Sequence, residues 1–361
     1  MNDSVIKKVS VSFLRAPLNQ PFRTALGEHE NLENILFVLE LSDGTKGYGE
    51  AAIAPHITKE TVHGTFKNLQ SVTPYLTGRN VRDYLKISSF LHERFSNNRS
   101  AIAAVEMALL DALTRRQKIP LWKFFGKKTK KIRTDITIVI ADPKETEKTA
   151  KKFYKQGFRA FKVKIGRDED SDFKRVLAVH RLTRKSKIYL DANQGYTAEE
   201  TLRFLKQLKK ANVYPALIEQ PVPKDDWEGL KRVNRLSGLV VCADETVSSV
   251  SDAVKLIRQK AASAINIKLM KSGLIEGRQI ALLAKRSGIK LMMGGMMETS
   301  LAMTAAAHLA SGLGFFDYID LDTPFFIKKK FDKNPYLSSN GIYNLHDVKS
   351  GIGIVKEGGV K

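Results

Sequence analysis

Five charged residues recur at nearly even spacing through the second half of this 361-residue chain. Each ends or directly follows a short apolar run, and in chain order they are Lys164, Asp191, Glu219, Asp244 and Lys268. The steps between them are 27, 28, 25 and 24 residues, and each step is about the length of one strand, loop and helix. A charged residue that returns at the end of successive βα units is typical of an active site on the C-terminal rim of a parallel α/β barrel.

The three acids predict a site for a divalent cation. Asp191, Glu219 and Asp244 end three consecutive predicted strands, so a barrel would bring their carboxylates together. Carboxylates held that close repel one another, and a hard cation removes the repulsion. One such acid alone is more often a helix cap, but three at the same position of successive units indicate shared ligands. An all-oxygen set favours Mg²⁺.

The lysines predict acid/base chemistry. Lys164 precedes the three acids and Lys268 follows them, so the two ammonium groups would face each other across the barrel mouth. Lys162 points the same way as Lys164 in a strand. A neighbouring ammonium group lowers a lysine pKa towards that of a general base, although Lys162 could equally be ion-paired to a carboxylate. Two opposed amines beside a cation predict proton removal from one face of a carbon and return from the other, which inverts a stereocentre.

Alternating strands and helices must position these residues. Between residues 126 and 323 short apolar runs separated by amphipathic segments predict an α/β fold, a barrel of about eight strands. We expect the strands near residues 135–140, 160–165, 187–191, 216–219, 239–243, 264–267, 289–293 and 316–319.

The flanking regions predict a second, smaller domain. Residues 1–125 lack βα repeats and show three predicted strands, at 5–14, 34–41 and 46–50, followed by three predicted helices, at 59–75, 81–95 and 100–117. The last helix is apolar nearly all round, which suits burial between two domains. Residues 21–31 are expected to form an irregular stretch of the right length for a functional loop. The charge run at 126–131 is expected to be the domain boundary, and residues 324–361 are expected to return to the first section.

Composition limits the class of protein. A single cysteine, Cys242, rules out an intramolecular disulfide framework, and neither a signal peptide nor an apolar run of spanning length is apparent, so we expect a soluble cytoplasmic protein. The formal charge of +22 makes a nucleic-acid-binding protein the alternative from another class. The lysines are spread through the predicted helices without an RNA-binding aromatic signature. We therefore expect a solvated basic surface, with no nucleic-acid and no membrane partner.

Short motifs make the chain resemble the enolase superfamily, in its muconate lactonizing enzyme subgroup. The motifs are KVK at 162–164, DAN at 191–193, EQP at 219–221, ADE at 243–245 and IKLMKSG at 267–273. The resemblance covers nearly the whole chain. The resemblance implies a modified TIM-type (β/α) barrel at 126–323 under an α+β capping domain made of residues 1–125 and the tail. It also implies that the three acids bind Mg²⁺, that Lys164 and Lys268 act as acid and base through an enediolate, and that Lys162 assists.

The end of the last predicted strand favours one activity within this subgroup. Asp320 and Asp322 would point the same way and could accept a free ammonium group; a surface capping pair is the less favoured alternative. They resemble the D-x-D motif of dipeptide epimerases, which binds the substrate's α-amino group. This implies an isomerase that inverts the α-carbon of the C-terminal residue of L,L-dipeptides. The alternatives are an N-acylamino acid racemase and an o-succinylbenzoate synthase, whose substrates lack that cation.

The resemblance also implies further substrate contacts. These are Thr137, on the first barrel strand, and the loop containing Gly295 and Met296. In members that epimerise L-Ala-Glu, an arginine after a Thr-Ala-Leu run binds the glutamate side chain, whereas here Gly27 follows that run. Either Arg23 or another cation substitutes, or the pocket is open. We expect a broad range of L-Ala-L-Xaa substrates that includes L-Ala-L-Glu, in the setting of murein peptide recycling. Whether the protein is a homo-oligomer is left open.

Overall fold

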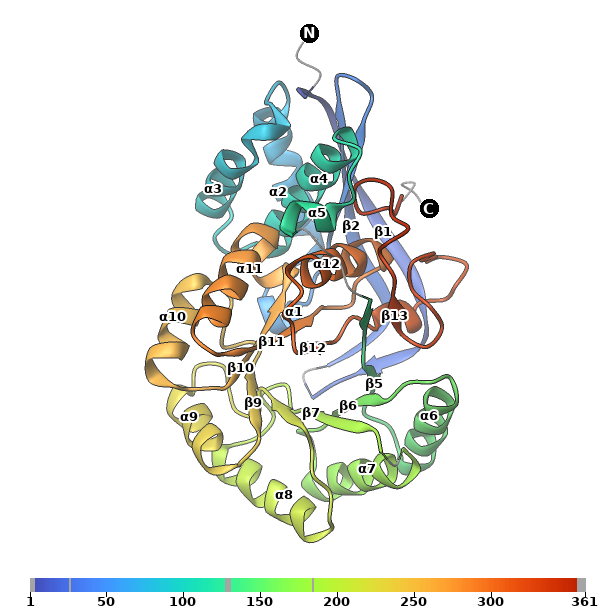
Figure 1. The fold of residues 1–361 in the computed structure, drawn as a ribbon, viewed down its shortest axis with the longest axis vertical. Helices are drawn as coiled ribbons and strands as arrows, with labels where there is room; N and C mark the ends of the chain where they lie inside the picture. The colour runs from blue at the N-terminus through green and yellow to red at the C-terminus, as the bar shows by residue number, and fades with distance from the viewer. Residues whose placement is uncertain (1–3, 26, 127–130, 184, 356–361) are drawn as a thin grey trace.

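The computed structural model describes residues 4–25, 27–126, 131–183 and 185–355. Figure 1 shows helices α6 to α10 around the lower part of the molecule, with the N-terminal helices and long strands above them. Among the described residues, no helix is both long enough and apolar enough to cross a membrane.

The lower part is a curled sheet of eight parallel strands in the order β12-β11-β10-β9-β8-β7-β6-β5. The strands are β5 (Ile136–Ile138), β6 (Ala160–Lys164), β7 (Lys187–Asp191), β8 (Leu217–Glu219), β9 (Val240–Ala243), β10 (Ala264–Lys268), β11 (Lys290–Gly294) and β12 (Tyr318–Ile319). All eight lie where the sequence predicts them. At the seam between the first and last strands, the Asp135 N–H donates to the Ile319 carbonyl at 2.9 Å, which brings the two edges together.

Helices connect the strands. They are α6 (Pro143–Lys155), α7 (Glu169–Leu182), α8 (Ala198–Lys210), α9 (Trp227–Leu236), α10 (Val250–Gln259), α11 (Leu269–Arg286) and α12 (Ser300–Leu313). Their starts follow from local sequence. The Asp142 side chain accepts the Glu145 N–H ahead of Pro143 at the start of α6, and Thr197 with Glu200 forms a capping box at α8.

The alternation of side chains along each strand separates the site from its apolar floor. Asp191 lies two residues after Tyr189, and Glu219 two residues after Leu217, so the members of each pair point the same way. Tyr189 and Leu217 belong to a small buried cluster with Cys242, Ala264 and Met292. The acids therefore lie directly above an apolar layer inside the barrel.

The upper part begins with a three-stranded antiparallel sheet of β1 (Ile6–Arg23), β2 (Glu28–Leu41) and β3 (Lys46–Ala51). The expectation of an irregular loop at residues 21–31 is wrong: after a register shift between Pro17 and Phe22, β1 and β2 continue pairing as far as Arg23 and Glu28. The other elements here are α1 (Pro55–Thr58), α2 (Val62–Leu76), η1 (Val81–Asp83), α3 (Tyr84–Arg94), α4 (Arg99–Arg116) and α5 (Leu121–Phe125).

Helix α4 joins the two parts and is buried along almost its whole length, as its all-round apolar sequence predicts. Glu106 of α4 is fully buried and accepts the N–H of Ile275 in α11 at 3.0 Å and the hydroxyl of Ser88 at 2.5 Å. Helix α11 is interrupted two residues before Ile275, at Gly273, which has φ 72° and ψ −177°. Glu106 of the cap thus provides an acceptor for a backbone N–H group of α11, across the interface between cap and barrel.

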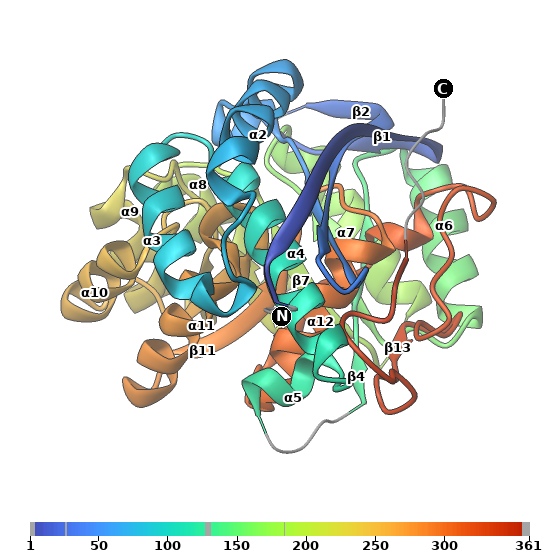
Figure 2. The same cartoon turned by 90° about the horizontal axis from the view of Figure 1, so that it is seen from above.

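The C-terminal tail contacts both parts. Strand β13 (Ile342–Tyr343) pairs with β4 (Ile132–Arg133), Ile327 bridges to Leu18 of β1, and the Ile352 N–H donates to Asp111 of α4 at 2.7 Å. A short turn, η2 (Thr323–Phe325), starts the tail. Figures 1 and 2 both show the tail on the same side of the molecule as α6 and the distal part of β1. Most of the expected boundary at 126–131 lies outside the described residues.

Candidate active site

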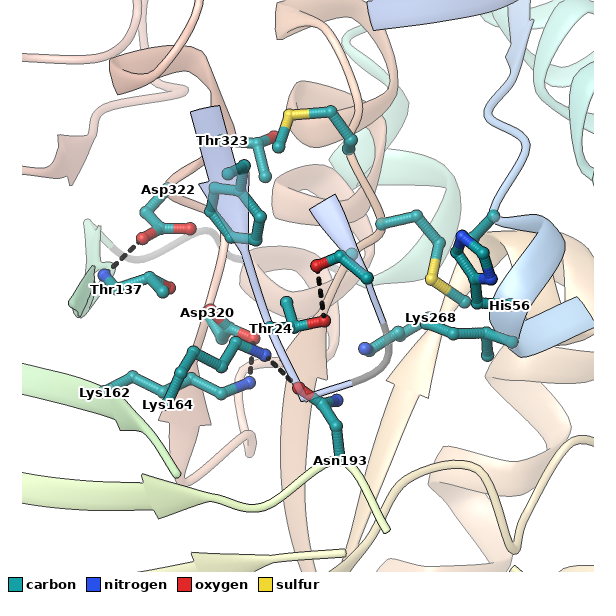
Figure 3. A pocket seen from close by; sticks show the side chains of 17 residues that line it. Thr24, His56, Thr137, Lys162, Lys164, Asn193, Lys268, Asp320, Asp322 and Thr323 are labelled. Carbon is teal, nitrogen blue, oxygen red and sulfur yellow. Dashed lines mark hydrogen bonds and ion pairs between the residues drawn. The ribbon is translucent and has the colours of Figure 1, made fainter. Parts of the chain in front are cut away.

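A pocket opens at the C-terminal ends of the barrel strands, beneath the hairpin tip and α1 (Figure 3). Barrel residues and cap residues line it together: Phe22, Thr24, Gly27, Ala54, His56, Ile57, Thr137, Lys162, Lys164, Asn193, Lys268, Gly295, Met296, Met297, Asp320, Asp322 and Thr323. The list includes eight of the residues chosen from the sequence. The three expected metal ligands lie just below it, at 0% exposure.

Two lysines approach this pocket from opposite sides. Figure 3 shows Lys164, from β6, and Lys268, from β10, with their side chains directed towards each other. The three strands β7, β8 and β9 lie between them in the sheet. Both side chains are nearly buried, at 6% and 4% exposure, so their ammonium groups depend on protein partners rather than on water.

On the Lys164 side of the pocket, the partners include two of the expected metal ligands, Asp191 and Glu219. Lys164 Nζ lies 2.6 Å from Asp191 Oδ2 and donates to Asn193 Oδ1 at 2.9 Å. Lys162 Nζ lies between two carboxylates, 2.9 Å from Asp191 Oδ2 and 2.9 Å from Glu219 Oε2. The alternative that Lys162 is ion-paired is thus what the structure shows.

On the Lys268 side of the pocket, Asp244 forms ion pairs with two lysines. Lys268 Nζ lies 2.6 Å from Asp244 Oδ2, and Lys271 Nζ lies 2.7 Å from Oδ1. Lys271 also donates to the carbonyls of Asp244 itself, of Val247 at 3.0 Å and of Asn266 at 3.0 Å. The Asp244 N–H in turn donates to the side chain of Gln220 at 2.9 Å.

Burial and charge shift the pKa values of these groups. Burial opposes ionisation of Asp191, but Lys162 and Lys164 outweigh it and lower the pKa of this carboxyl. Burial likewise opposes the charged form of Lys268, but Asp244 outweighs it and raises the pKa of this ammonium group. Burial, followed by the charge of Asp191, raises the pKa of Glu219 to about 8.

The three carboxylates suit a divalent cation. All are fully buried, and Glu219 Oε2 and Asp244 Oδ2 receive no hydrogen bond within the described chain, only the ion pairs to lysine. Oxygen atoms in this state are ready ligands, and a set made only of carboxylates is the type that Mg²⁺ prefers.

A second acidic group closes the seam of the barrel. Asp322 Oδ2 accepts the N–H of Thr137 at 2.5 Å, and Asp320 Oδ2 accepts from Lys162 at 2.7 Å. Asp135 lies beside them, and oxygen atoms of the three carboxyls lie within 4.8 Å of one another. Burial, followed by the charge of Asp320, raises the pKa of Asp322 to about 7.

The other substrate contacts expected from the sequence differ in whether they line the pocket. Gly295 and Met296 line the pocket, on the loop after β11. Arg23 is not among the lining residues: it lies at the end of β1, where its side chain pairs with Glu28 at 2.9 Å and its carbonyl accepts the Ile140 N–H. His56, which the sequence did not single out, lies at the pocket wall beside Gly27.

Several supporting residues were also missed. Asn193 binds Lys164, Asn266 donates to Glu219 Oε1 at 2.8 Å, and Lys271 and Gln220 hold Asp244. A usable signal existed for three of them, since Asn193, Gln220 and Lys271 stand one to three residues after a predicted site residue within the same motif. Asn266 and Asp135 carry no such signal, because their role follows only from contacts across strands.

An eight-stranded parallel barrel with buried acids and lysines at its strand ends, closed by an α+β cap, defines an enolase-type fold and site. The chain belongs to the mandelate racemase/muconate lactonizing enzyme family. The model of that family's N-terminal domain matches residues 8–126, and the model described as enolase C-terminal domain-like matches residues 145–357.

Relatives of known activity cover nearly the whole chain. A hydrophobic dipeptide epimerase from Citrifermentans bemidjiense is 48% identical over 97% of both chains, and an aromatic dipeptide epimerase from Herpetosiphon aurantiacus is 38% identical over 96% of this chain and 97% of its own. Among solved structures, the dipeptide epimerase from Enterococcus faecalis, complexed with Mg and L-Leu-L-Tyr, has a TM-score of 0.91 and 30% identity, covering 97% of this chain and 99% of that one.

Proposed function

We propose that this protein is a Mg²⁺-dependent dipeptide epimerase that inverts the α-carbon of the C-terminal residue of L,L-dipeptides. The observation that carries the proposal is the placement of Lys164 and Lys268 on opposite sides of a pocket whose third side holds Asp320 and Asp322. A racemising centre needs a proton donor and acceptor on each face of one carbon. A free dipeptide needs, in addition, an anionic partner for its ammonium group.

The residues have distinct roles in this reaction. One lysine removes the α-proton from its face while the other, still charged, delivers a proton to the opposite face. Asp320 and Asp322 bind the substrate ammonium group and so place the α-carbon of the second residue between the lysines. Asp191, Glu219 and Asp244 hold the ion, and Lys162 balances charge between Asp191 and Glu219. When bound, Mg²⁺ neutralises these carboxylates and polarises the substrate carboxylate, which makes the adjacent α-proton more acidic.

The pocket wall supports apolar side chains on the substrate. The wall includes the apolar residues Phe22, Ala54, Ile57, Met296 and Met297. No arginine lines the pocket in the part of the chain that the structure describes. We therefore propose a broad range of second residues weighted towards hydrophobic ones, in line with the names of the two relatives described above.

Gly27 and His56 shape this wall where related enzymes for L-Ala-Glu are expected to carry an arginine. A Cβ atom built on Gly27 would lie 2.9 Å from the His56 ring, so the glycine makes room for the imidazole. L-Ala-L-Glu is expected to be a poorer substrate than L-Ala-L-Phe or L-Ala-L-Leu.

The test is α-proton exchange in D₂O with Mg²⁺, followed by NMR on a panel of L-Ala-L-Xaa dipeptides. We expect deuterium incorporation and inversion at the second residue in the wild type. Lys164→Ala and Lys268→Ala should both lose inversion, and each should retain exchange of at most one epimer, since one lysine remains for one face. Lys206→Ala, at an exposed position of α8, is the matched control.

N-acylated substrates separate this proposal from its nearest alternative. N-acetylation of the dipeptide removes the ammonium group and should abolish turnover, whereas an N-acylamino acid racemase would accept acylated amino acids and ignore free dipeptides. We also propose that the protein works in the cytoplasm without a nucleic-acid partner. A titration with duplex DNA or RNA that gave tight, steeply salt-dependent binding would contradict the second point.

A further inference from the structure

A third carboxyl group lies beside Asp320 and Asp322 and has no part in the chemistry described so far. Asp135 directly precedes β5, and its backbone N–H donates to Ile319 across the barrel seam. Its side chain is 1% exposed and has an oxygen atom within 4.8 Å of oxygen atoms of both other acids. Asp135 does not line the pocket itself, but lies directly behind the two acids that are expected to receive the substrate ammonium group.

No donor in the described chain satisfies Asp135. Both of its oxygen atoms are buried and receive no hydrogen bond. An ionised carboxylate left in this state carries the full cost of lost hydration, several kcal/mol. A protonated carboxyl can instead donate a hydrogen bond, and the carboxyl group of Asp320 is within hydrogen-bonding reach. Two carboxyl groups at such a distance share one proton, because both cannot be charged.

The surroundings favour the protonated form. The titratable groups that face Asp135 are Asp320 and Asp322 at the end of β12, Lys162 on β6 and Tyr189 on β7. Lys162 is the one cation among them, and its charge is already shared by Asp191, Glu219 and Asp320, each within 2.9 Å. Burial, followed by the charges of Asp320 and Asp322, raises the pKa of Asp135 well above its usual value, and Lys162 offsets only part of this.

We propose that Asp135 is a positioning residue that keeps its proton and donates a hydrogen bond to Asp320. The bond holds Asp320 against Lys162 on one side and the substrate ammonium group on the other. It also limits the three carboxyl groups to two negative charges at most, so the pocket binds one ammonium group rather than a second metal ion. This inference rests on the proposed function, since the group that Asp320 positions is the amino terminus of a dipeptide.

Two substitutions of one side chain separate a neutral donor from a charged partner. Asp135→Asn is neutral, has the same shape and keeps an N–H donor, so KM and kcat for L-Ala-L-Phe should stay close to those of the wild type. Asp135→Ala removes the donor, and KM should rise about tenfold, as for one lost hydrogen bond to a charged group, with kcat much less affected. If Asp135→Asn raised KM as much as Asp135→Ala, the charged form would be required and the proposal would be wrong.

An infrared measurement tests the proton without using activity. The wild type minus Asp135→Asn difference spectrum at pH 7 should contain the carbonyl stretching band of a protonated carboxylic acid. Asp170→Asn, at an exposed position of α7, should show only the loss of a carboxylate band. A carboxylate band for Asp135 would overturn the proposal. If the wild type failed to epimerise any dipeptide, the proposed function would fail, while the infrared result would still decide the state of Asp135.

Discussion

Lys271 and Asp244 form a buried ion pair in which Lys271 Nζ lies 2.7 Å from Asp244 Oδ1. The other oxygen of the same carboxylate lies 2.6 Å from Lys268 Nζ. Lys271 thus holds one side of Asp244 through two bonds to Asp244 itself, one to Val247 and one to Asn266 of β10, and leaves Oδ2 for the lysine that we assign to catalysis.

Lys271→Met should destabilise the protein strongly. It removes the only donor described for three of these acceptors and leaves a buried carboxylate half paired, for which the expected loss in unfolding free energy is about 3–5 kcal/mol. Urea unfolding measures the loss. Lys206→Met, on the exposed face of α8, should change stability by less than about 0.5 kcal/mol. Equal stability of the two variants would show that Lys271 does not hold Asp244.

Adding Mg²⁺ should stabilise the folded protein, because the ion binds the assembled carboxylates and not the unfolded chain. At a free concentration of a hundred times Kd the gain is about 2.7 kcal/mol, which thermal unfolding detects as a rise in Tm. Glu219→Gln should remove most of the rise, and chelation with EDTA should reverse it and abolish epimerisation. Glu228→Gln, an exposed acid of α9, should keep it. A rise of the same size in Glu219→Gln would place the ion elsewhere.

Gly273, at the interruption within α11, can be compared with Gly288, just after the end of this helix. Gly273 and Gly288 both have φ 72°, but a Cβ on Gly273 would lie 2.3 Å from Glu106 Oε2, whereas a Cβ on Gly288 meets nothing within 4 Å. Gly288→Ala should cost about 1–2 kcal/mol, the cost of a left-handed residue. Gly273→Ala should cost about 3 kcal/mol or more, because it also displaces Glu106 from Ile275. Similar unfolding midpoints would contradict this account of the α4–α11 contact.

Stability should fall in mild acid through His308. Its Nδ1 accepts the Trp122 N–H at 3.0 Å, its Nε2 lies 3.0 Å from the Ile352 carbonyl, and burial lowers the pKa of this imidazole to about 4. The folded state therefore disfavours the charged ring. Its contribution is complete above pH 6.5 and is lost as pH falls towards 4, by up to about 3 kcal/mol. His308→Gln should show a smaller loss between pH 7 and pH 4; an unchanged pH dependence would exclude His308 as the cause.

Substrate preference should respond to the contact between Gly27 and His56. Gly27→Ala pushes the imidazole out of its place, and we expect kcat/KM for L-Ala-L-Phe to fall by about tenfold relative to L-Ala-L-Ala, the range of one altered apolar contact. His56→Ala should shift the preference towards larger second residues. Gly44→Ala, at a distant turn, is the control for a glycine substitution in the cap. An unchanged ranking in both variants would remove this wall from the specificity pocket.

The barrel could be predicted because its signal is local. Each strand is a short apolar run of the right length, and the chain repeats the unit eight times, so every expected strand was found. The long β1–β2 hairpin was missed because Pro17 and Pro21 suggest a break. β1 is the edge strand of its sheet, where proline costs no ladder hydrogen bond on the open side, and the register shifts between Pro17 and Phe22.

The site likewise contains residues that could be predicted from the sequence and contacts that could not. Lys164, Asp191 and Glu219 stand at strand ends, so chain spacing alone predicted that they would meet. The position of Lys271 in the IKLMKSG motif marks it as a possible site residue, but not Asp244 as its partner. The proximity of Asp135 to Asp320 joins residues far apart in sequence, and nothing in the spacing indicates it. The expectation for the cap loop also missed His56, because Gly27 and His56 meet only once the hairpin tip lies over α1.

The bond from Thr137 N–H to Asp322 joins the first barrel strand to the chain just after the last one. Asp322, which we assign to substrate recognition, therefore also helps to close the barrel. A substitution of Asp322 that changed which substrate group is bound would also remove the hydrogen bond that closes the barrel. Recognition of a free amino terminus is therefore difficult to change by a single mutation without destabilising the fold. Gly27 and His56, which shape the wall for the second residue, are not part of this seam, so we expect the preference for the second residue to change there while the barrel stays closed.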